Sequence, residues 1–249
     1  MNILLTNDDG YRAIGITELH KALAKTHSVY LVAPKRNCSG MSSAISLMAD
    51  IEVEEIDENI YSVAGTPADC SYLGLLSIIS EPIDLIVSGI NLGANLGEDI
   101  FYSGTVGAAI TGRRLNYVPI ALSVAAYEPL HLEYLATKSL QIVHQASQLP
   151  ADKNLLLNVN FPDLPESEIK GIKMTKLGKR GIPDQPLLIH EDGKSSFYRF
   201  GPSGSLMPNQ EFTDMQAVAD GYISISILNY DMSAVDQSFA SYAEVFECE

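Results

Sequence analysis

Cysteine, basic residues and long apolar runs are scarce in this 249-residue sequence, and each shortage excludes a class of protein. The three cysteines, Cys38, Cys70 and Cys248, stand far apart without a CxxC pair, which excludes a zinc knuckle or a disulfide framework and favours reduced thiols. No apolar run approaches the roughly 20 residues of a membrane span, and strand-forming residues begin at Asn2, which leaves no room for a signal peptide. We therefore expect a soluble, cytoplasmic protein without a membrane partner.

The balance of charge is strongly acidic. Sixteen Lys and Arg residues stand against thirty-one Asp and Glu residues, which gives a net charge of −15. This charge argues against a nucleic-acid polymer or an anionic membrane as the main partner. It leaves room for a small anionic ligand that is held by a metal ion, a helix N-terminus or a few local basic residues.

Several motifs of nucleotide and hydrolase chemistry are also missing. The glycine spacing of residues 10–17 fits a P-loop, but Ile16 stands where the phosphate-binding lysine is required. No GxGxxG follows the first predicted strand, no GxSxG elbow occurs, and the five histidines form no HExxH pair. Any phosphate chemistry must therefore come from another arrangement of residues.

Hydrophobic periodicity predicts strands that alternate with helices through the first two thirds of the chain. The expected strands are 3–6, 29–33, 84–88, 119–124 and 154–159, and the expected helices are 14–25, 67–79, 105–115 and 132–149. Residues 51–56 alternate like a solvent-facing strand, which 61–63 could pair with. This alternation predicts an α/β fold with a parallel sheet that is covered by helices on both faces.

The alternation of strand and helix patterns ends near residue 162. We place an approximate boundary near Pro165, between a core of 1–165 and a second part of 166–249. Extended segments at 172–177, 187–190 and 197–200 favour arms over further α/β units. A short helix at 213–219 then leads into a strand at 222–228. Apolar residues at helical spacing predict a terminal amphipathic helix at 233–246, which docks on its own core or on a neighbour.

The first strand runs directly into two adjacent carboxylates, Asp8 and Asp9. At the poorly solvated end of a buried parallel strand, their repulsion is best relieved by a bound cation or a shifted pKa. Open α/β sheets bind their ligands at this edge, so the pair indicates a site for a hard metal ion. Asp-Asp-Gly is also good turn chemistry, and an acidic turn is the alternative interpretation.

Segments that follow successive parallel strands emerge at the same edge, so three loops should converge: 7–10, 36–40 and 88–97. Beside the aspartates they bring Ser39 and Asn91 as candidate metal ligands, and Asn37 and Asn95 as candidate substrate contacts. Oxygen ligands alone suit Mg²⁺, Mn²⁺ or Ca²⁺ and are poor for zinc. For Ser39 or Asn91 taken alone, ordinary loop hydrogen bonding is the alternative.

A glycine-bearing turn enters the helix expected at 105–115, and its free backbone N–H groups suit an anion. The candidate phosphate contacts in this turn are Ser103, Gly104 and Thr105. The alternative is that Ser103 or Thr105 simply caps the helix. A metal ion beside the turn would favour the phosphate interpretation.

Taken together, these segments closely resemble the SurE family of survival-protein nucleotidases. The matching stretches are NDDG at 7–10, RNCSG at 36–40, GTPADC at 65–70, SGINLGANLG at 88–97 and YSGTVGAA at 102–109. Later matches lie at 158–162, 177–180, 213–214 and 221–222, so that the resemblance covers nearly the whole chain in order.

The resemblance implies a metal-dependent acid phosphatase that acts on nucleoside 5′-monophosphates, with 3′-monophosphates and short polyphosphate as side substrates. By the family pattern, Asp8, Asp9, Ser39 and Asn91 match the ligands of one divalent ion per subunit, Mg²⁺ or Mn²⁺. The family also implies a Rossmann-like core with a protruding β-hairpin and a C-terminal arm that is exchanged between subunits, in homodimers or homotetramers. Asp8 or Asp9 would act as catalytic carboxylates, either by orienting or deprotonating water or, for Asp8, by direct attack on phosphorus.

Two positions depart from the family pattern. Cys38 stands where members usually carry a longer polar residue, and Thr111 stands where they usually carry glutamate.

Two other classes of protein also fit an acidic pair after the first strand. They are a phospho-receiver domain, although 84–88 ends in Ser-Gly and lacks an acceptor aspartate, and a nucleotide-binding stress protein without catalysis.

Overall fold

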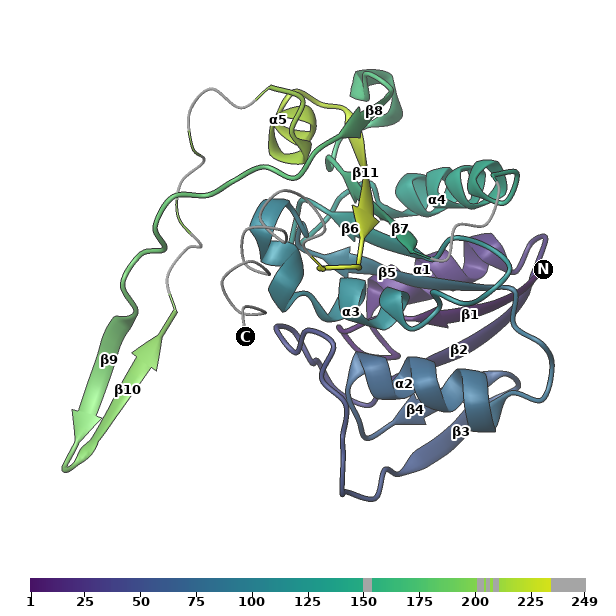
Figure 1. Ribbon diagram of the computed structural model, residues 1–249, viewed down its shortest axis with the longest axis horizontal. Helices are drawn as coiled ribbons and strands as arrows, with labels where there is room; N and C mark the ends of the chain where they lie inside the picture. Colours follow the sequence, from purple (N-terminus) through teal and green to yellow (C-terminus); the bar gives the residue numbers. More distant parts are fainter. Residues whose placement is uncertain (150–153, 201–203, 205–206, 208–210, 234–249) are drawn as a thin grey trace, which may run out of the picture.

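The computed structural model describes residues 1–149, 154–200, 204, 207 and 211–233. Within these residues a nine-stranded sheet runs through the body of the molecule, and a separate two-stranded hairpin projects away from it (Figure 1). Helices cover both faces of the large sheet (Figure 1). The α/β fold predicted from the alternation of strands and helices is confirmed.

The strand order in the large sheet is β3-β4-β2-β1-β5-β6-β7-β11-β8. The bounds are β1 Asn2–Thr6, β2 Ser28–Pro34, β3 Val53–Asp57, β4 Ile60–Val63, β5 Leu85–Leu92, β6 Ile120–Val124, β7 Leu155–Phe161, β8 Ile172–Thr175 and β11 Ile223–Asn229. Two pairings, β3 with β4 and β11 with β7, are antiparallel. The other pairings in the sheet are parallel, so the sheet is mostly parallel. The turn between β3 and β4 has only two residues, which permits only an antiparallel return.

The chain changes direction across the sheet at β1. From β1 it proceeds to β2 on one side, and β5 later pairs with β1 on the other side. Loops after β1 and β5 therefore leave the sheet at a topological switch point, which is where open α/β sheets form their ligand crevice. β5 is longer than predicted and continues through Asn91 to Leu92, with a register shift against β6 between Ser88 and Asn91.

Two pairs of helices flank the sheet. On one face α1, Ile14–Leu23, packs with α4, Leu132–Ala146, and on the other α2, Pro67–Leu73, packs with α3, Gly104–Ile110. α2 begins as predicted, because the Thr66 side chain accepts the Asp69 N–H and the Asp69 carboxylate accepts the Thr66 N–H. The helix predicted over 67–79 changes at Gly74 into a π-helical turn, and α3 ends earlier than predicted.

Alternate residues of the central strands enter two apolar clusters. Ile3 and Leu5 of β1 pack toward α1, whereas Leu4 packs toward α2, and all three are fully buried. A strand that is buried on both faces needs apolar residues at every position, which explains the continuous apolar run at the start of the chain.

Residues after 165 contribute to the large sheet as well as to a projection. β8, which the sequence indicated as part of an extended arm, instead pairs parallel with β11 at the sheet edge. The projecting arm is the hairpin of β9, Leu187–Asp192, and β10, Ser195–Arg199 (Figure 1). A short helix, α5, covers Asp214–Ala219. The terminal helix predicted at 233–246 lies outside the described residues, apart from Ser233.

Among the helices of the described part of the chain, none has the length and apolar character that crossing a membrane requires.

Candidate metal and phosphate site

Four segments meet at the carboxyl edge of the sheet near the switch point. They are the loops after β1, β2 and β5, and the turn before α3, by which we mean residues 103–105, the N-cap and the first two residues of that helix. Asp8 belongs to the first of these and is tied to two others. Its carbonyl oxygen accepts the Cys38 N–H at 2.7 Å, and its carboxylate Oδ1 accepts the Thr105 hydroxyl at 2.6 Å. Asp8 is only 3% exposed, so the contacts with Thr105 and Cys38 lie at the base of the site.

Asp9 connects the loop after β1 to the loops after β2 and β5. Its Oδ2 accepts the Leu92 N–H at 3.0 Å, directly after Asn91, and its Oδ1 accepts the Asn37 amide at 3.4 Å. The Asn37 Oδ1 in turn accepts the Ser39 N–H at 2.8 Å and the Ser39 hydroxyl at 2.7 Å. A chain of contacts therefore runs from Asp9 through Asn37 to Ser39.

Asn91 lies near the end of β5 and is only 9% exposed. Its amide nitrogen donates to the Gly93 carbonyl at 2.7 Å, which fixes the orientation of the amide. The Oδ1 atom is then the acceptor that Asn91 offers to a ligand. Because Asp9 accepts the N–H of the next residue, Leu92, the Asn91 main chain is held beside the aspartate pair.

The turn before α3 contains all three candidate phosphate contacts. The Ser103 side chain accepts the Val106 N–H at 3.1 Å, so Ser103 caps the helix, which was the alternative interpretation of this residue. A hydroxyl that accepts this bond can still donate its proton to a ligand. Thr105 does not cap the helix, because its hydroxyl donates to Asp8. At Gly104, a Cβ atom would lie 2.8 Å from the Asp8 Cβ and 3.1 Å from Oδ2, so a side chain there would intrude on the carboxylate.

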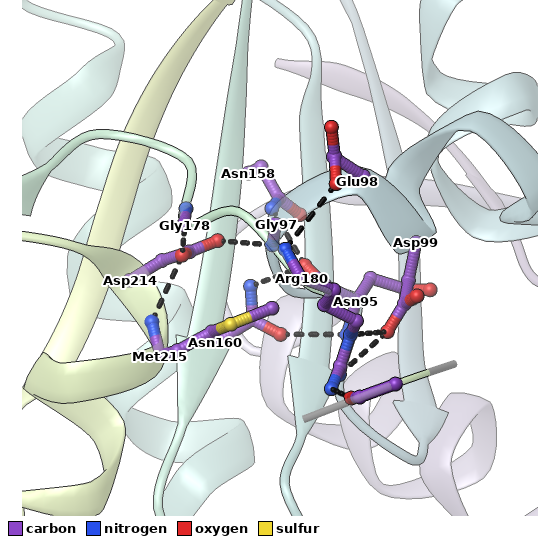
Figure 2. A network of polar contacts seen from close by, with 11 residues as sticks. Asn95, Gly97, Glu98, Asp99, Asn158, Asn160, Gly178, Arg180, Asp214 and Met215 are labelled. Atoms are coloured by element: carbon purple, nitrogen blue, oxygen red, sulfur yellow. Dashed lines mark hydrogen bonds and ion pairs between the residues drawn. The ribbon is translucent and has the colours of Figure 1, made fainter. Parts of the chain in front are cut away.

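Asn95 is held by strands β6 and β7. Its N–H donates to the Asn160 Oδ1 at 2.8 Å, and its carbonyl accepts the side-chain amides of Asn158 and Asn160, each at 2.9 Å (Figure 2). Its own amide nitrogen donates to the Ser123 hydroxyl at 2.8 Å. The hydrogen bonds of Asn95 thus lead away from the aspartates, and its Oδ1 is the atom with which it would contact a substrate.

The role of Asn158 and Asn160 was not predicted from the sequence. They sit two positions apart on a buried strand, on the same face of the sheet, and both are fully buried. Two amides at this spacing within an otherwise apolar strand are a signal that they bind a nearby loop, because buried amides need partners.

The electrostatics of the pair fit a cation. Burial raises the pKa of Asp8 from 3.8 to about 6, with the Thr105 hydrogen bond opposing the rise and the neighbouring Asp9 charge adding to it. Burial also raises the pKa of Asp9. Two adjacent carboxylates that are costly to ionise together would be stabilised by a divalent ion. Across the described part of the chain, no three His, Cys, Asp or Glu side chains are placed to hold one metal ion, so a cation at Asp8 and Asp9 would need neutral oxygens as its further ligands.

The raised pKa of Asp8 predicts how the stability of the metal-free protein depends on pH. Since the folded-state pKa, about 6, lies above the unfolded value of 3.8, the stability that Asp8 contributes is present below pH 3.8 and is lost as the pH rises through 6. The full loss is about 3 kcal/mol of unfolding free energy. Urea unfolding in the presence of a chelator, compared between wild type and Asp8→Asn across this window, measures it. A pH profile identical in the two proteins would contradict the prediction.

The two departures from the family pattern lie on different sides of the site. Cys38 is buried, its thiol contacts the Gly65 carbonyl at 3.6 Å, and burial raises its pKa, so it is a packing residue of the loop after β2. Thr111 is the C-cap of α3, at the opposite end of the helix from Gly104. The glutamate that family members usually carry at position 111 would therefore lie about 10 Å along the helix from the turn that faces Asp8.

Fold and site together define a doubly wound α/β protein with a cluster of oxygen donors at its switch point, beside a turn that presents backbone N–H groups. The family model described as survival protein SurE matches residues 3–184. The chain belongs to the SurE family, as the resemblance in the sequence implied.

Relatives and a solved structure agree with this assignment. The chain is 42% identical over 236 residues to the 5′-nucleotidase SurE of Pseudoalteromonas atlantica, which covers 94% of each chain. It is 42% identical over 241 residues to the 5′-nucleotidase SurE of Alkalilimnicola ehrlichii, which covers 95% of this chain and 93% of the relative. The crystal structure of the SurE protein from Aquifex aeolicus matches with a TM-score of 0.87 at 37% identity, over 98% of this chain and 99% of that one. The named relatives are thus phosphomonoesterases that share nearly the whole length of this chain.

Proposed function

We propose that this protein is a metal-dependent 5′-nucleotidase that hydrolyses nucleoside 5′-monophosphates to nucleoside and phosphate. The single observation that carries the proposal is the hydrogen bond from the Thr105 hydroxyl to Asp8, which joins one carboxylate of the acidic pair to the turn before α3. The names of relatives at about 40% identity support the nucleotide substrate. Activity on 3′-monophosphates and short polyphosphate is part of the same proposal, because a site that recognises mainly the phosphoryl group tolerates different leaving groups.

The residues that would hold the metal ion are Asp8, Asp9, Ser39 and Asn91. One divalent ion per subunit, Mg²⁺ or Mn²⁺, fits this set of carboxylate, hydroxyl and amide oxygens. When bound, the ion would neutralise charge on the phosphoryl oxygens and act as a Lewis acid. The backbone N–H groups of Gly104 and Thr105 and the Ser103 hydroxyl would bind the remaining phosphate oxygens, and Asn37 and Asn95 would contact the substrate from the neighbouring loops.

Asp8 is the carboxylate that we assign to the attack on phosphorus, either through a water molecule or directly. Thr105 occupies its Oδ1, so Oδ2, which lies next to Gly104, is the oxygen that faces the phosphate turn. From there Asp8 would orient water or accept its proton, or would attack phosphorus itself to form an aspartyl phosphate. Rapid acid quenching with a substrate labelled on phosphorus separates these routes, since only direct attack leaves label on the protein.

The proposed activity is tested by phosphate release from a panel of 5′- and 3′-mononucleotides and short polyphosphate, after chelation and again with added Mg²⁺ or Mn²⁺. We expect release from 5′-mononucleotides that requires the added ion. Nucleotide binding without release would indicate a stress protein without catalysis. Stable labelling of an aspartate, without turnover, would indicate a phospho-receiver.

We also propose that the part after residue 165 serves assembly, in a homodimer or homotetramer, while 1–165 carries the catalytic groups. The hairpin supports this because Leu188 and Tyr198, which pair across its strands, are 51% and 65% exposed on the projecting arm. Substitution of both by serine, or truncation after Met232, should lower the molar mass found by light scattering more than it lowers the rate of hydrolysis. An unchanged mass in both variants would contradict the assembly proposal.

The widely spaced cysteines support a cytoplasmic location.

A further inference from the structure

Two side chains from the last third of the chain contact the segment that leads from Asn95 toward the turn before α3. They are Asp214, at the first position of α5, and Arg180, between β8 and β9. Figure 2 shows both of them reaching the same short segment, Asp214 at the Gly97 N–H and Arg180 at the Asp99 carboxylate. We call Asp214 and Arg180 the loop clamp.

Asp214 is a fully buried carboxylate whose oxygens are all directed at backbone donors. Its Oδ2 accepts the Gly97 N–H at 2.7 Å, and its Oδ1 accepts the N–H groups of Gly178 and Met215, each at 2.8 Å. A buried carboxylate is costly unless its oxygens are hydrogen-bonded, and bonds to a charged acceptor are about twice as strong as neutral ones. Asp214 therefore fixes Gly97 against Gly178 firmly.

Arg180 holds the next part of the segment. Its Nε and Nη2 donate to the Asp99 Oδ2 at 3.0 and 2.7 Å, and its Nη1 donates to the Gly204 carbonyl at 3.1 Å (Figure 2). The side chains of Arg180 and Asp99 are each 25% exposed, so this pair is only partly screened by solvent. The planar guanidinium fixes direction as well as distance.

The backbone at Gly97 leaves little room for movement. Its φ is +56°, a left-handed conformation that favours glycine, and a Cβ atom there would lie 2.5 Å from the Gly178 carbonyl oxygen and 2.4 Å from the Met215 Cε. On the other side, Asn158 and Asn160 hold the main chain of Asn95. The segment is thus fixed at Asn95 by β7 and at Gly97 and Asp99 by the clamp.

Both ends of this segment carry groups of the proposed site. Asn91 precedes the segment, Asn95 is its first residue, and a 3₁₀ turn, Gly97–Tyr102, begins within it and leads to Ser103 and Gly104. We propose that Asp214 and Arg180 are positioning residues for the reaction, which hold Asn91 and Asn95 at a fixed distance from the turn that binds phosphate. The inference rests on the proposed function. Its physical reason is that a displacement of about 1 Å in a reacting geometry can cost about a hundredfold in rate.

The test uses Asp214→Asn and Arg180→Gln in the full chain. Asp214→Asn keeps the shape but turns one acceptor into a donor that faces a backbone N–H, so the segment must shift. We expect Asp214→Asn to lower kcat by about tenfold or more and to weaken Mn²⁺ binding several-fold, with KM nearly unchanged. Arg180→Gln should lower kcat about threefold to tenfold, since Asp214 remains.

Two control variants separate positioning from a loss of stability. Asp220→Asn changes an exposed acid at the other end of the same helix, which accepts the Gln216 amide. Ser226→Ala removes a buried hydroxyl of β11 that bonds Thr175 at 2.8 Å, so it matches the burial of Asp214 without touching the 95–99 segment. Both controls should keep kcat and Mn²⁺ affinity within about twofold of wild type, even where Ser226→Ala lowers the melting temperature.

Measurements are made below the melting transition, with the folded fraction followed by circular dichroism. Wild-type kcat and Mn²⁺ affinity in folded Asp214→Asn would overturn the inference while leaving the proposed function intact. Should Asp214→Asn fail to fold, Arg180→Gln decides in the same way. Should wild type release no phosphate from any mononucleotide, the proposed function fails, and Mn²⁺ titration alone then decides: weaker binding in the clamp variants supports the clamp, and unchanged binding overturns it.

Discussion

Asp8→Asn is expected to lower kcat for 5′-mononucleotide hydrolysis by about a thousandfold, the largest effect of any single change proposed for this protein. The substitution removes one of two charged metal ligands and the carboxylate oxygen that faces Gly104. It keeps the shape of the side chain, and the Thr105 hydroxyl can still donate to the amide oxygen. Phosphate release under saturating Mn²⁺, with Mn²⁺ affinity measured in parallel, gives the result.

The loss in Asp8→Asn should come without any loss of folding. Because Asp8 is costly to ionise when it is buried, the metal-free variant should be more stable than metal-free wild type at neutral pH. Asp57→Asn is the matched control, since Asp57 is an exposed acid on β3 whose carboxylate accepts the N–H of Glu58. Near-wild-type hydrolysis by Asp8→Asn would show that the carboxylate plays no part in the reaction.

Gly104→Ala is the second large prediction, with an expected loss of about a hundredfold in kcat. The added methyl group would lie 2.8 Å from the Asp8 Cβ and 3.2 Å from the Pro67 Cγ. Asp8 and Pro67 are both buried, so the methyl group has no open space into which it can shift. Asp8 must therefore move away from the turn before α3. Steady-state kinetics should show the loss mainly in kcat, because the transition-state geometry is disturbed.

Gly112→Ala controls for the steric conflict itself. A Cβ atom at Gly112 would lie 3.1 Å from the Ile86 Cβ, which is also a tight contact with a buried residue, but this position is beyond the C-terminal end of α3. We expect Gly112→Ala to lower the melting temperature and to leave kcat within about twofold of wild type. If Gly104→Ala were as active as Gly112→Ala, the turn before α3 would not be where the phosphate binds.

The sequence was sufficient to predict the arrangement of the central strands, because their signal is local. The apolar run Ile3-Leu4-Leu5 marks a buried strand before Asp8, and Thr66 before Pro67 marks a helix start, whatever the rest of the chain does. The convergence of loops followed from the parallel sheet alone. In the structure, contacts of Asp8 with Thr105 and of Asp9 with Leu92 join those loops.

The features that escaped prediction depend on contacts between distant residues. Asp214 meets Gly97 across 117 positions, and no periodicity or spacing in the sequence relates the two. Whether Ser103 or Thr105 caps α3 depends on where Asp8 lies, since Thr105 donates to that carboxylate instead. The placement of β8 likewise depends on β11, which is the strand that it pairs with.

The most direct test of the account is the location of the metal ion. Anomalous X-ray diffraction from crystals grown with Mn²⁺ identifies the ion by its scattering, independently of any activity. We predict one site per chain, with oxygens of Asp8, Asp9, Ser39 and Asn91 at about 2.0–2.3 Å. An ion bound elsewhere, with these four side chains directed away from it, would contradict the account.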